Sequence, residues 1–238
     1  MTESERKFGT VLVGWVPPRA PDSPVIDGRY ARLERLDPAR HAAALHAANS
    51  VDDRLWDYLP YGPFATETAY RDWAAGMAPQ TDPFFYAIID RATGRAGGVA
   101  SYLRITPASG SIEVGHINLA PALQGTCVAT EAMYLMMDWA FAAGYRRYEW
   151  KCDALNLPSR RAAERFGFSY EGVFRQATVV KGRNRDTAWF AMTDGDWPAL
   201  KAAYALWLSP DNFDAAGRQK ARLSDLTHPL LVARDPAF

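Results

Sequence analysis

The sequence has little of what several common protein classes require. Its 238 residues contain only two cysteines, which excludes a disulfide framework and a cysteine metal site and predicts a reducing cytoplasm and no metal. Basic and acidic residues balance at 27 each, so the net charge gives no argument for a nucleic-acid partner. The N-terminal residues are charged and no apolar run approaches membrane-spanning length, so neither secretion nor a membrane partner is predicted.

Two common phosphate-binding loops are also absent. The chain has neither Gly-x-x-x-x-Gly-Lys-Ser/Thr nor Gly-x-Gly-x-x-Gly, which excludes a Walker loop and a dinucleotide fingerprint. Residues 113–119 instead alternate as a strand does, and Gln124-Gly125 leads into a helix rich in Ala, Met and Leu. A strand, a tight loop and a helix N-terminus form an anion site, because the first helical N–H groups lack intrahelical partners. An ordinary strand-to-helix turn is the alternative for this loop alone.

The rest of the pattern predicts one domain with additional segments at both ends. Residues 1–27 form a proline-rich arm, residues 28–197 the domain, and residues 198–238 a closing helix and a partly irregular tail. Strands are predicted from apolar periodicity and turn residues at 28–36, 84–89, 97–106, 113–119, 147–152, 168–180 and 187–193. Helices are predicted at 38–49, 66–77, 129–143, 158–166 and 197–208.

The predicted anion loop resembles that of one enzyme family. Residues 124–129 read Gln-Gly-Thr-Cys-Val-Ala and are similar to the acyl-CoA pyrophosphate loop of the Gcn5-related N-acetyltransferases (GNAT), Gln/Arg-x-x-Gly-x-Gly/Ala. Cys127 stands where the pattern has its middle glycine. Glycine permits close backbone approach, and cysteine is small enough for the loop to survive with an altered phosphate fit.

Two later segments resemble the RimJ/RimL branch of the same family. Residues 156–168 match its Asn-x-x-Ser…Gly-Phe signature, and residues 171–177 match its Glu-Gly-x-x-Arg/Lys-Gln-Ala pattern. The resemblance implies a GNAT fold of the α/β (α+β) class, a mixed and mostly antiparallel sheet with helices on both faces. In that fold two neighbouring strands, here those ending near Leu119 and Cys152, splay apart to hold the pantetheine arm.

Acetyl-CoA is the cosubstrate that the resemblance implies. Its binding residues are then Leu119, Gln124, Gly125, Thr126, Cys127, Val128, Ala129, Thr130, Asn156 and Ser159. The backbone N–H near Leu119 would stabilise the thioester oxygen. Many relatives have, where this chain has Ala163, a tyrosine that acts as the general acid. In its absence Ser159 is the group expected to protonate the departing thiolate. The alternative for Ser159 is a hydrogen-bonding residue in the first turn of a short helix.

The candidate bases are Glu113 and His116, which lie three residues apart on the central strand. Strand alternation puts their side chains on opposite faces, so at most one should point into the site. His116 has the better unperturbed pKa and Glu113 the more family-like chemistry. Either could instead be a solvated strand residue. Thr178 occupies a position where some relatives carry a carboxylate.

The acceptor is predicted to contact an aromatic loop at residues 52–64. Trp56, Tyr58 and Tyr61 could line a pocket there, or form a plug beneath the loop. The predicted activity is transfer of an acetyl group from acetyl-CoA to a primary amine of a small molecule, peptide or protein N-terminus. The alternative is a catalytically silent acyl-CoA-binding protein that acts through protein contacts. The arm and the last hairpin could each serve a homodimer interface.

Overall fold

One eight-stranded sheet organises the chain, and the computed structural model describes residues 8–215 and 217–238. The strand order is β1-β2-β3-β4-β5-β6-β8-β7. Only β5 and β6 pair in parallel, so the predicted mixed and mostly antiparallel GNAT-like sheet is confirmed. The strands are β1 (Val25–Asp27), β2 (Ala31–Arg35), β3 (Phe84–Asp90), β4 (Arg95–Thr106), β5 (Ser111–Leu119), β6 (Arg147–Asp153), β7 (Ser169–Val180) and β8 (Arg183–Thr193).

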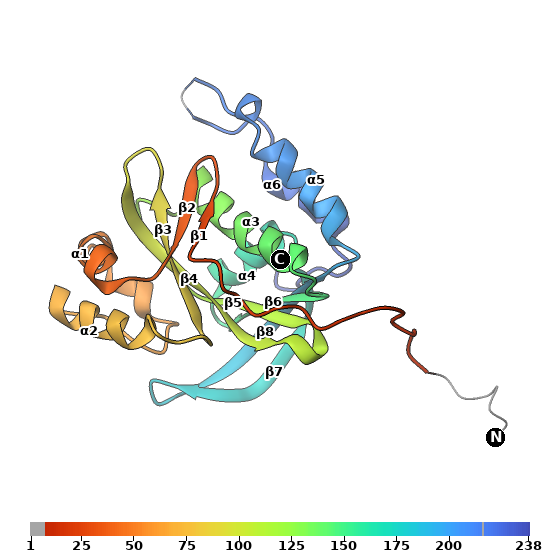
Figure 1. Cartoon of the computed structure of the whole chain (residues 1–238), viewed down its shortest axis with the longest axis horizontal. Coiled ribbons are helices and arrows are strands. Elements are labelled where there is room, and N and C mark those ends of the chain that lie inside the picture. Colours follow the sequence, from red (N-terminus) through yellow and green to blue (C-terminus); the bar gives the residue numbers. More distant parts are fainter. Residues whose placement is uncertain (1–7, 216) are drawn as a thin grey trace.

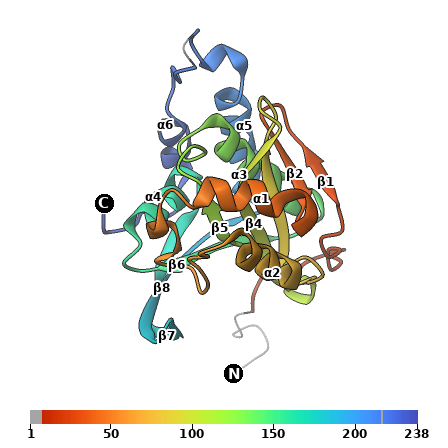
Figure 2. The same cartoon turned by 90° about the vertical axis from the view of Figure 1, so that its left-hand side faces the viewer.

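Helices cover both faces of the sheet. Figure 1 shows α1 (Pro38–Asn49) and α2 (Glu67–Met77) on one side of the strands and the later helices on the opposite side, and Figure 2 gives the view at right angles. The opposite side carries α3 (Cys127–Ala142), α4 (Leu157–Arg165), α5 (Trp197–Trp207) and the short α6 (Leu223–Thr227). In the described part of the chain, no helix is long and apolar enough to cross a membrane.

Local sequence signals explain where the helices begin. Asp37 accepts hydrogen bonds from two backbone N–H groups at the start of α1, and Pro38 follows at the first helical position. Thr126 and Asn156 cap α3 and α4 in the same way. Helix α3 therefore begins at Cys127, two residues before the predicted start at 129, so its first N–H groups open directly onto the predicted anion loop.

Two hydrophobic cores leave part of the sheet without a helical cover. The larger core lies between the sheet and α3, α4 and α5, and it includes Val114, Tyr148 and Phe190. The smaller core joins α1 and α2 to β3 and β4, through Phe85 and Trp56 among others. No residue of β5, β6 or β8 that the structure describes belongs to this smaller core. The face of those strands on the α1/α2 side therefore remains available for a site.

Strands β5 and β6 separate along their length. They pair only from Ser111 opposite Arg147 to Val114 opposite Trp150, and the rest of each strand lies beyond the ladder. These are the two strands that were predicted to splay. The loop that leads into α3 follows directly after the carboxyl end of β5.

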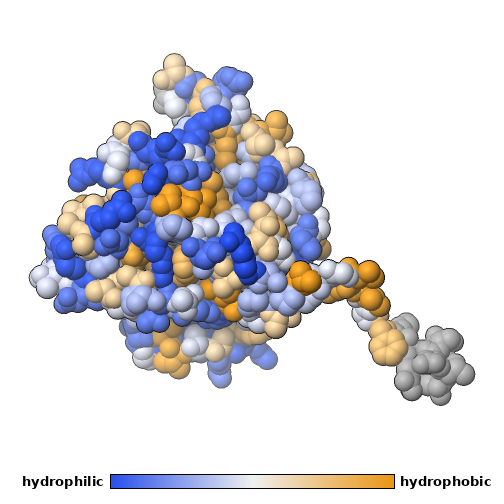
Figure 3. Space-filling view, in the orientation of Figure 1, coloured by the Kyte–Doolittle hydropathy of each residue, from blue (hydrophilic) through white to orange (hydrophobic). Residues whose placement is uncertain are grey.

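Both ends of the described chain lie outside the sheet. Residues 8–14 of the arm extend away from the body, and Figure 3 shows hydrophobic side chains along this part. Val11 and Val13 are 79% and 91% exposed. The rest of the arm lies against the domain, where the Tyr145 hydroxyl donates to the Arg19 carbonyl and Trp139 Nε1 donates to Ser23 Oγ, both at 3.1 Å. The C-terminal tail also packs back onto the domain. Asp235 is buried and forms a two-pronged ion pair with Arg160 of α4, at 2.5 and 2.7 Å.

Candidate active site

The loop between β5 and α3 has the geometry of an anion site. Gly125 has φ +70°, and a Cβ added there would meet nothing within 4 Å, so the backbone is both left-handed and openly accessible. Gln124 folds back, and its amide Nε2 donates to the Leu119 carbonyl at 2.9 Å. Thr126 Oγ1 accepts from Ala129 N at 3.2 Å. The loop is thus held in shape by its own side chains.

Several N–H groups in this loop are free to bind a ligand. Among the described residues, no acceptor is hydrogen-bonded to the backbone N–H of Gly125, Cys127 or Val128. Burial raises the pKa of the Cys127 thiol to about 12, so the thiol stays neutral and does not repel a phosphate. The positive end of the α3 dipole adds to these donors. The loop therefore offers N–H donors and a helix N-terminus to an anion, although Cys127 stands where the family pattern has its middle glycine.

A buried amide without partners lies where β5 and β6 separate. Asn118 is 2% exposed, and neither its Oδ1 nor its Nδ2 is hydrogen-bonded within the described structure. It stands opposite Val99 of β4, a residue of the smaller core, which places its side chain on the α1/α2 face. Buried polar groups normally have partners. A ligand with amide groups, such as the pantetheine arm, would supply them.

Ser159 stands beside the end of β6, in the first turn of α4. Its hydroxyl accepts a hydrogen bond from Trp150 Nε1 at 3.1 Å, and its N–H donates to the capping Asn156 side chain at 3.2 Å. The Cys152 thiol lies next to it, and burial raises the pKa of that thiol to about 11. The predicted hydroxyl is therefore at the splay, while the Asn156 side chain is already used as a helix cap.

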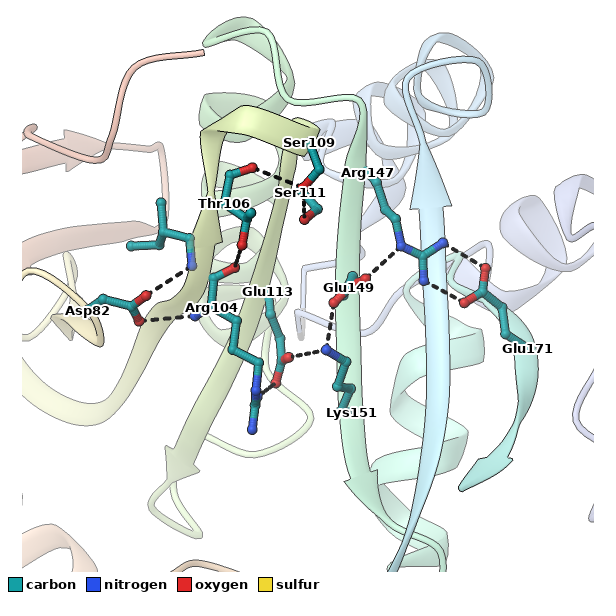
Figure 4. Close-up of polar contacts among 11 residues, drawn as sticks. Asp82, Arg104, Thr106, Ser109, Ser111, Glu113, Arg147, Glu149, Lys151 and Glu171 are labelled. Carbon is teal, nitrogen blue, oxygen red and sulfur yellow. Dashed lines mark hydrogen bonds and ion pairs between the residues drawn. The ribbon is translucent and has the colours of Figure 1, made fainter. Parts of the chain in front are cut away.

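An ion-pair ladder crosses the uncovered face of the sheet (Figure 4). Lys151 links two carboxylates, with its Nζ 2.9 Å from Glu113 Oε2 and 2.6 Å from Glu149 Oε2. Arg104 lies 2.6 Å from the other Glu113 oxygen, and Arg147 joins Glu149 to Glu171 of β7. Burial raises the pKa of Glu113, and the two cations oppose that shift. We call this set the ladder: Arg104, Glu113, Lys151, Glu149, Arg147 and Glu171.

The second candidate base, His116, lies on the same face as Glu113, so the prediction of opposite faces was wrong. A β-bulge is the reason: two residues of β5 lie between Gly115 and Asn118, whereas the partner strand has one residue between Ser101 and Val99. His116 takes φ +51° at this bulge. The extra residue resets the alternation on which the prediction relied.

The His116 ring is enclosed by aromatic side chains. It stacks on Tyr61 with ring centres 5.6 Å apart, contacts Phe85 at 5.2 Å, and its Nδ1 lies 3.2 Å from the Tyr61 hydroxyl. Burial, and then the charges of Arg104 and Arg185, lower the pKa of His116 to about 4. The imidazole is therefore neutral at pH 7 and able to accept a proton.

This lowered pKa predicts a specific loss of stability in acid. Between pH 6.5 and about 4 the unfolded chain binds a proton at His116 that the folded chain does not, so stability falls as the pH falls through this window. The contribution from this residue reaches about 3 kcal/mol. Urea unfolding of wild type and His116→Asn at pH 7.0, 5.5 and 4.5 measures it. Identical pH dependence in the two proteins would contradict the buried neutral imidazole.

The three aromatic residues predicted to meet the acceptor have different places. Trp56 is 3% exposed and packs in the smaller core against Phe64 and Tyr70, so for this residue the plug alternative describes the structure. Tyr61 lies on His116. Tyr58 is 40% exposed, and its hydroxyl donates to the Leu155 carbonyl at 3.3 Å.

Tyr58 lines a cavity of about 310 Å³ beside the splay, between the aromatic loop, the end of β6 and the β7–β8 hairpin. The lining residues, which sequence reasoning had mostly missed, are Asp57, Tyr58, Asp153, Leu155, Val180, Lys181, Arg183, Asn184 and Arg185. A larger cavity of about 360 Å³ lies between α3 and α5, lined by Glu131 and Tyr134 among others. The smaller cavity lies beside the uncovered face of the sheet, which carries the ladder and His116. It is the candidate acceptor pocket.

Comparison with known proteins agrees with this geometry. A family model described as "Acetyltransferase (GNAT) domain" matches residues 31–169, more than half of the chain. The chain belongs to the GNAT acetyltransferase family. A GNAT from Brucella melitensis, known from a crystal structure, is 47% identical with a TM-score of 0.89 over 91% of this chain and 99% of that one.

Two further relatives of this GNAT chain extend the comparison. A probable GNAT-family acetyltransferase from Chromobacterium violaceum ATCC 12472 is 44% identical with a TM-score of 0.77, over 82% of this chain and 98% of the other. A Bacillus licheniformis protein described as uncharacterized N-acetyltransferase p20 is 25% identical over 65% of this chain and 84% of its own length. Membership implies acyl transfer from acetyl-CoA, with the acceptor left open.

Proposed function

We propose that this GNAT chain transfers an acetyl group from acetyl-CoA to a primary amine. One arrangement supports the proposal. Among the described residues, the backbone N–H groups of Gly125, Cys127 and Val128 have no acceptor. Within the same part of the chain the buried amide of Asn118, on the stretch of β5 beyond its ladder with β6, has no partner. The first suits a pyrophosphate and the second suits the amides of pantetheine. The splay then leads to a face with a neutral imidazole and an adjoining cavity.

The residues around the splay have separate roles in the proposed reaction. The amine nitrogen attacks the thioester carbonyl carbon, the C–N bond forms, the C–S bond breaks, and the thiolate leaves. We assign the removal of the ammonium proton, directly or through water, to His116, whose imidazole is neutral at pH 7 and, with its pKa lowered to about 4, a weak base. Glu113 is less suited, since its carboxylate is engaged by Arg104 and Lys151. Ser159 protonates the leaving thiolate and regains a proton, through solvent, from the attacking nitrogen, and the Leu119 N–H stabilises the developing oxyanion.

We also propose the branch of the family, the cellular location and the kind of acceptor. The segments at 156–168 and 171–177 support the RimJ/RimL branch, and the two unpaired cysteines support a cytoplasmic location. A cavity of about 310 Å³ favours a small or peptidic amine over a strongly basic protein tail.

A silent acyl-CoA-binding protein is the second candidate. Ala163, which stands where many relatives have the tyrosine that acts as general acid, is fully buried in the larger core. Cys127 and Thr178 also depart from the family pattern. This candidate predicts binding of acetyl-CoA without its consumption in the presence of any amine.

Thermal unfolding with and without acetyl-CoA tests the shared requirement of both candidates. At ~100 times its dissociation constant the ligand should add about 2.7 kcal/mol of stability to wild type. Gly125→Asp should abolish this gain, because the added carboxylate enters the anion site. Gly14→Asp is the matched control: Gly14 also has φ +70° and open space, but it lies in the arm. No gain in wild type would overturn the proposal.

A further inference from the structure

The candidate acceptor pocket has an excess of positive charge. Lys181, Arg183 and Arg185 line it from the β7–β8 hairpin, against Asp57 and Asp153 from the opposite walls. Lys181 already donates to the Trp56 carbonyl at 2.8 Å. Neither arginine forms an ion pair within the described residues, although many other arginines of the chain do.

Arg185 is directed toward the uncovered face of the sheet. Alternate residues of β8 share one face, and Trp189 on that face lies beneath Lys151 of the ladder, with Nζ 3.8 Å from the ring centre. The Arg185 Nε is buried and has no acceptor in the described structure. Its charge also lowers the pKa of His116 and of the Cys152 thiol, so it lies close to both walls of the splay.

We infer that this pocket binds an acidic group of the acceptor, so that the acceptor is a small amine that also carries a carboxylate or a phosphate. The inference rests on the proposed function and narrows it to a substrate class. A guanidinium with a free, buried N–H matches either anion. An acid seated on Arg185 would also hold the amine near His116 and would offset part of the positive charge that keeps the imidazole weakly basic.

The two acidic residues of the pocket do not cancel this preference. Asp153 is partly engaged, because its Oδ1 accepts from Leu155 N at 2.9 Å. Asp57 is exposed at the mouth of the pocket. Three cations against two carboxylates leave a net charge of one positive, which an anionic acceptor neutralises. The cavity of about 310 Å³ is of the size that takes one small molecule.

Acetyl transfer to matched pairs of amines tests the inference. O-phosphoethanolamine is compared with ethanolamine, and β-alanine with propylamine, so that each pair differs in the acidic group and the two pairs distinguish phosphate from carboxylate. Wild type should show kcat/KM on the order of 10- to 100-fold higher for the acidic member of at least one pair. Arg185→Gln should remove most of that ratio, mainly through KM. Arg175→Gln, an exposed cation of the same hairpin that does not line the pocket, should keep it. Equal rates within both pairs would overturn the inference.

Direct binding separates this inference from the activity itself. Calorimetric titration of O-phosphoethanolamine and of β-alanine into the wild-type protein with CoA present should show binding that Arg185→Gln weakens on the order of tenfold or more. Such binding without any turnover would sustain the pocket and refute the amine transfer. Turnover of neutral amines, with neither acidic probe bound, would refute the pocket and leave the proposed function standing.

Discussion

Replacing Glu113 by alanine should lower the free energy of unfolding by about 3–5 kcal/mol, because it leaves the ammonium of Lys151 with one partner fewer in a buried site. The Lys151 side chain is 7% exposed and that of Glu113 is 3% exposed, so neither charge can turn to solvent without moving the sheet. The loss of Glu113 affects Arg104 less, because the Arg104 side chain is 60% exposed and its charge stays solvated. Urea unfolding at pH 7 measures the change.

Two further variants show whether the lost charge is the cause. Glu113→Leu combined with Lys151→Met should lose less stability than Glu113→Ala alone, because the buried ammonium that loses a partner in Glu113→Ala is removed as well. Glu67→Ala removes an exposed ion pair with Arg71 on α2 and should cost less than about 1 kcal/mol. A Glu113→Ala protein as stable as wild type would show that the ladder is not a structural element.

Replacing His116 by asparagine should lower kcat/KM for acetyl transfer by ~10²- to 10⁴-fold, the usual contribution of a general base. Asparagine keeps polarity at the bulge but cannot take a proton from the amine. Steady-state kinetics with the best amine found above measures the loss. The stabilisation by acetyl-CoA should remain, since the anion loop is untouched.

The control for this prediction is another histidine in a similar setting. His46→Asn alters a partly buried imidazole on α1, whose Nε2 lies 3.1 Å from the Phe64 carbonyl, and full activity is expected there. A His116→Asn enzyme with wild-type kcat/KM would eliminate His116 as the base. Glu113→Gln would then be the next variant to measure, at a temperature where it remains folded.

Most of the fold was predictable because its signals are local. The caps Asp37, Thr126 and Asn156 begin helices as their side-chain chemistry suggests, and Gly144 and Gly167 follow helix ends with left-handed backbone. The candidate anion loop could be predicted in the same way, since strand, loop and helix N-terminus are consecutive in the chain. Such features need no knowledge of which strands are neighbours.

The parts of the site that escaped prediction depend on neighbours. The bulge that turns His116 toward the Glu113 face exists only as a mismatch between β4 and β5, which no single strand reveals. In the sequence, Asn118 is an ordinary polar residue of an alternating strand. Only the folded structure shows that its side-chain amide is buried and has no hydrogen-bond partner in the described part of the chain. The candidate role of Arg185 likewise depends on a cavity that three separate segments form, and the sequence alone does not show that these segments meet.

The tail shows the same limit. The ion pair between Arg160 and Asp235 joins residues 75 positions apart, and no periodicity connects them. An Asp near the end of a polar segment gives no sequence signal that it will be buried.

The ladder also restricts how the strands align with their neighbours while the chain folds. Strand β6 places Tyr148, Trp150 and Cys152 in the large core and keeps Glu149 and Lys151 on the other face. A slip of β6 by one residue against β5 or β8 would exchange these faces and push two charges into the apolar interior. The misaligned sheet would thus lose its core contacts and its ion pairs together. The ladder therefore destabilises every misaligned register of β6. By favouring the native register it also fixes the place where β5 and β6 separate.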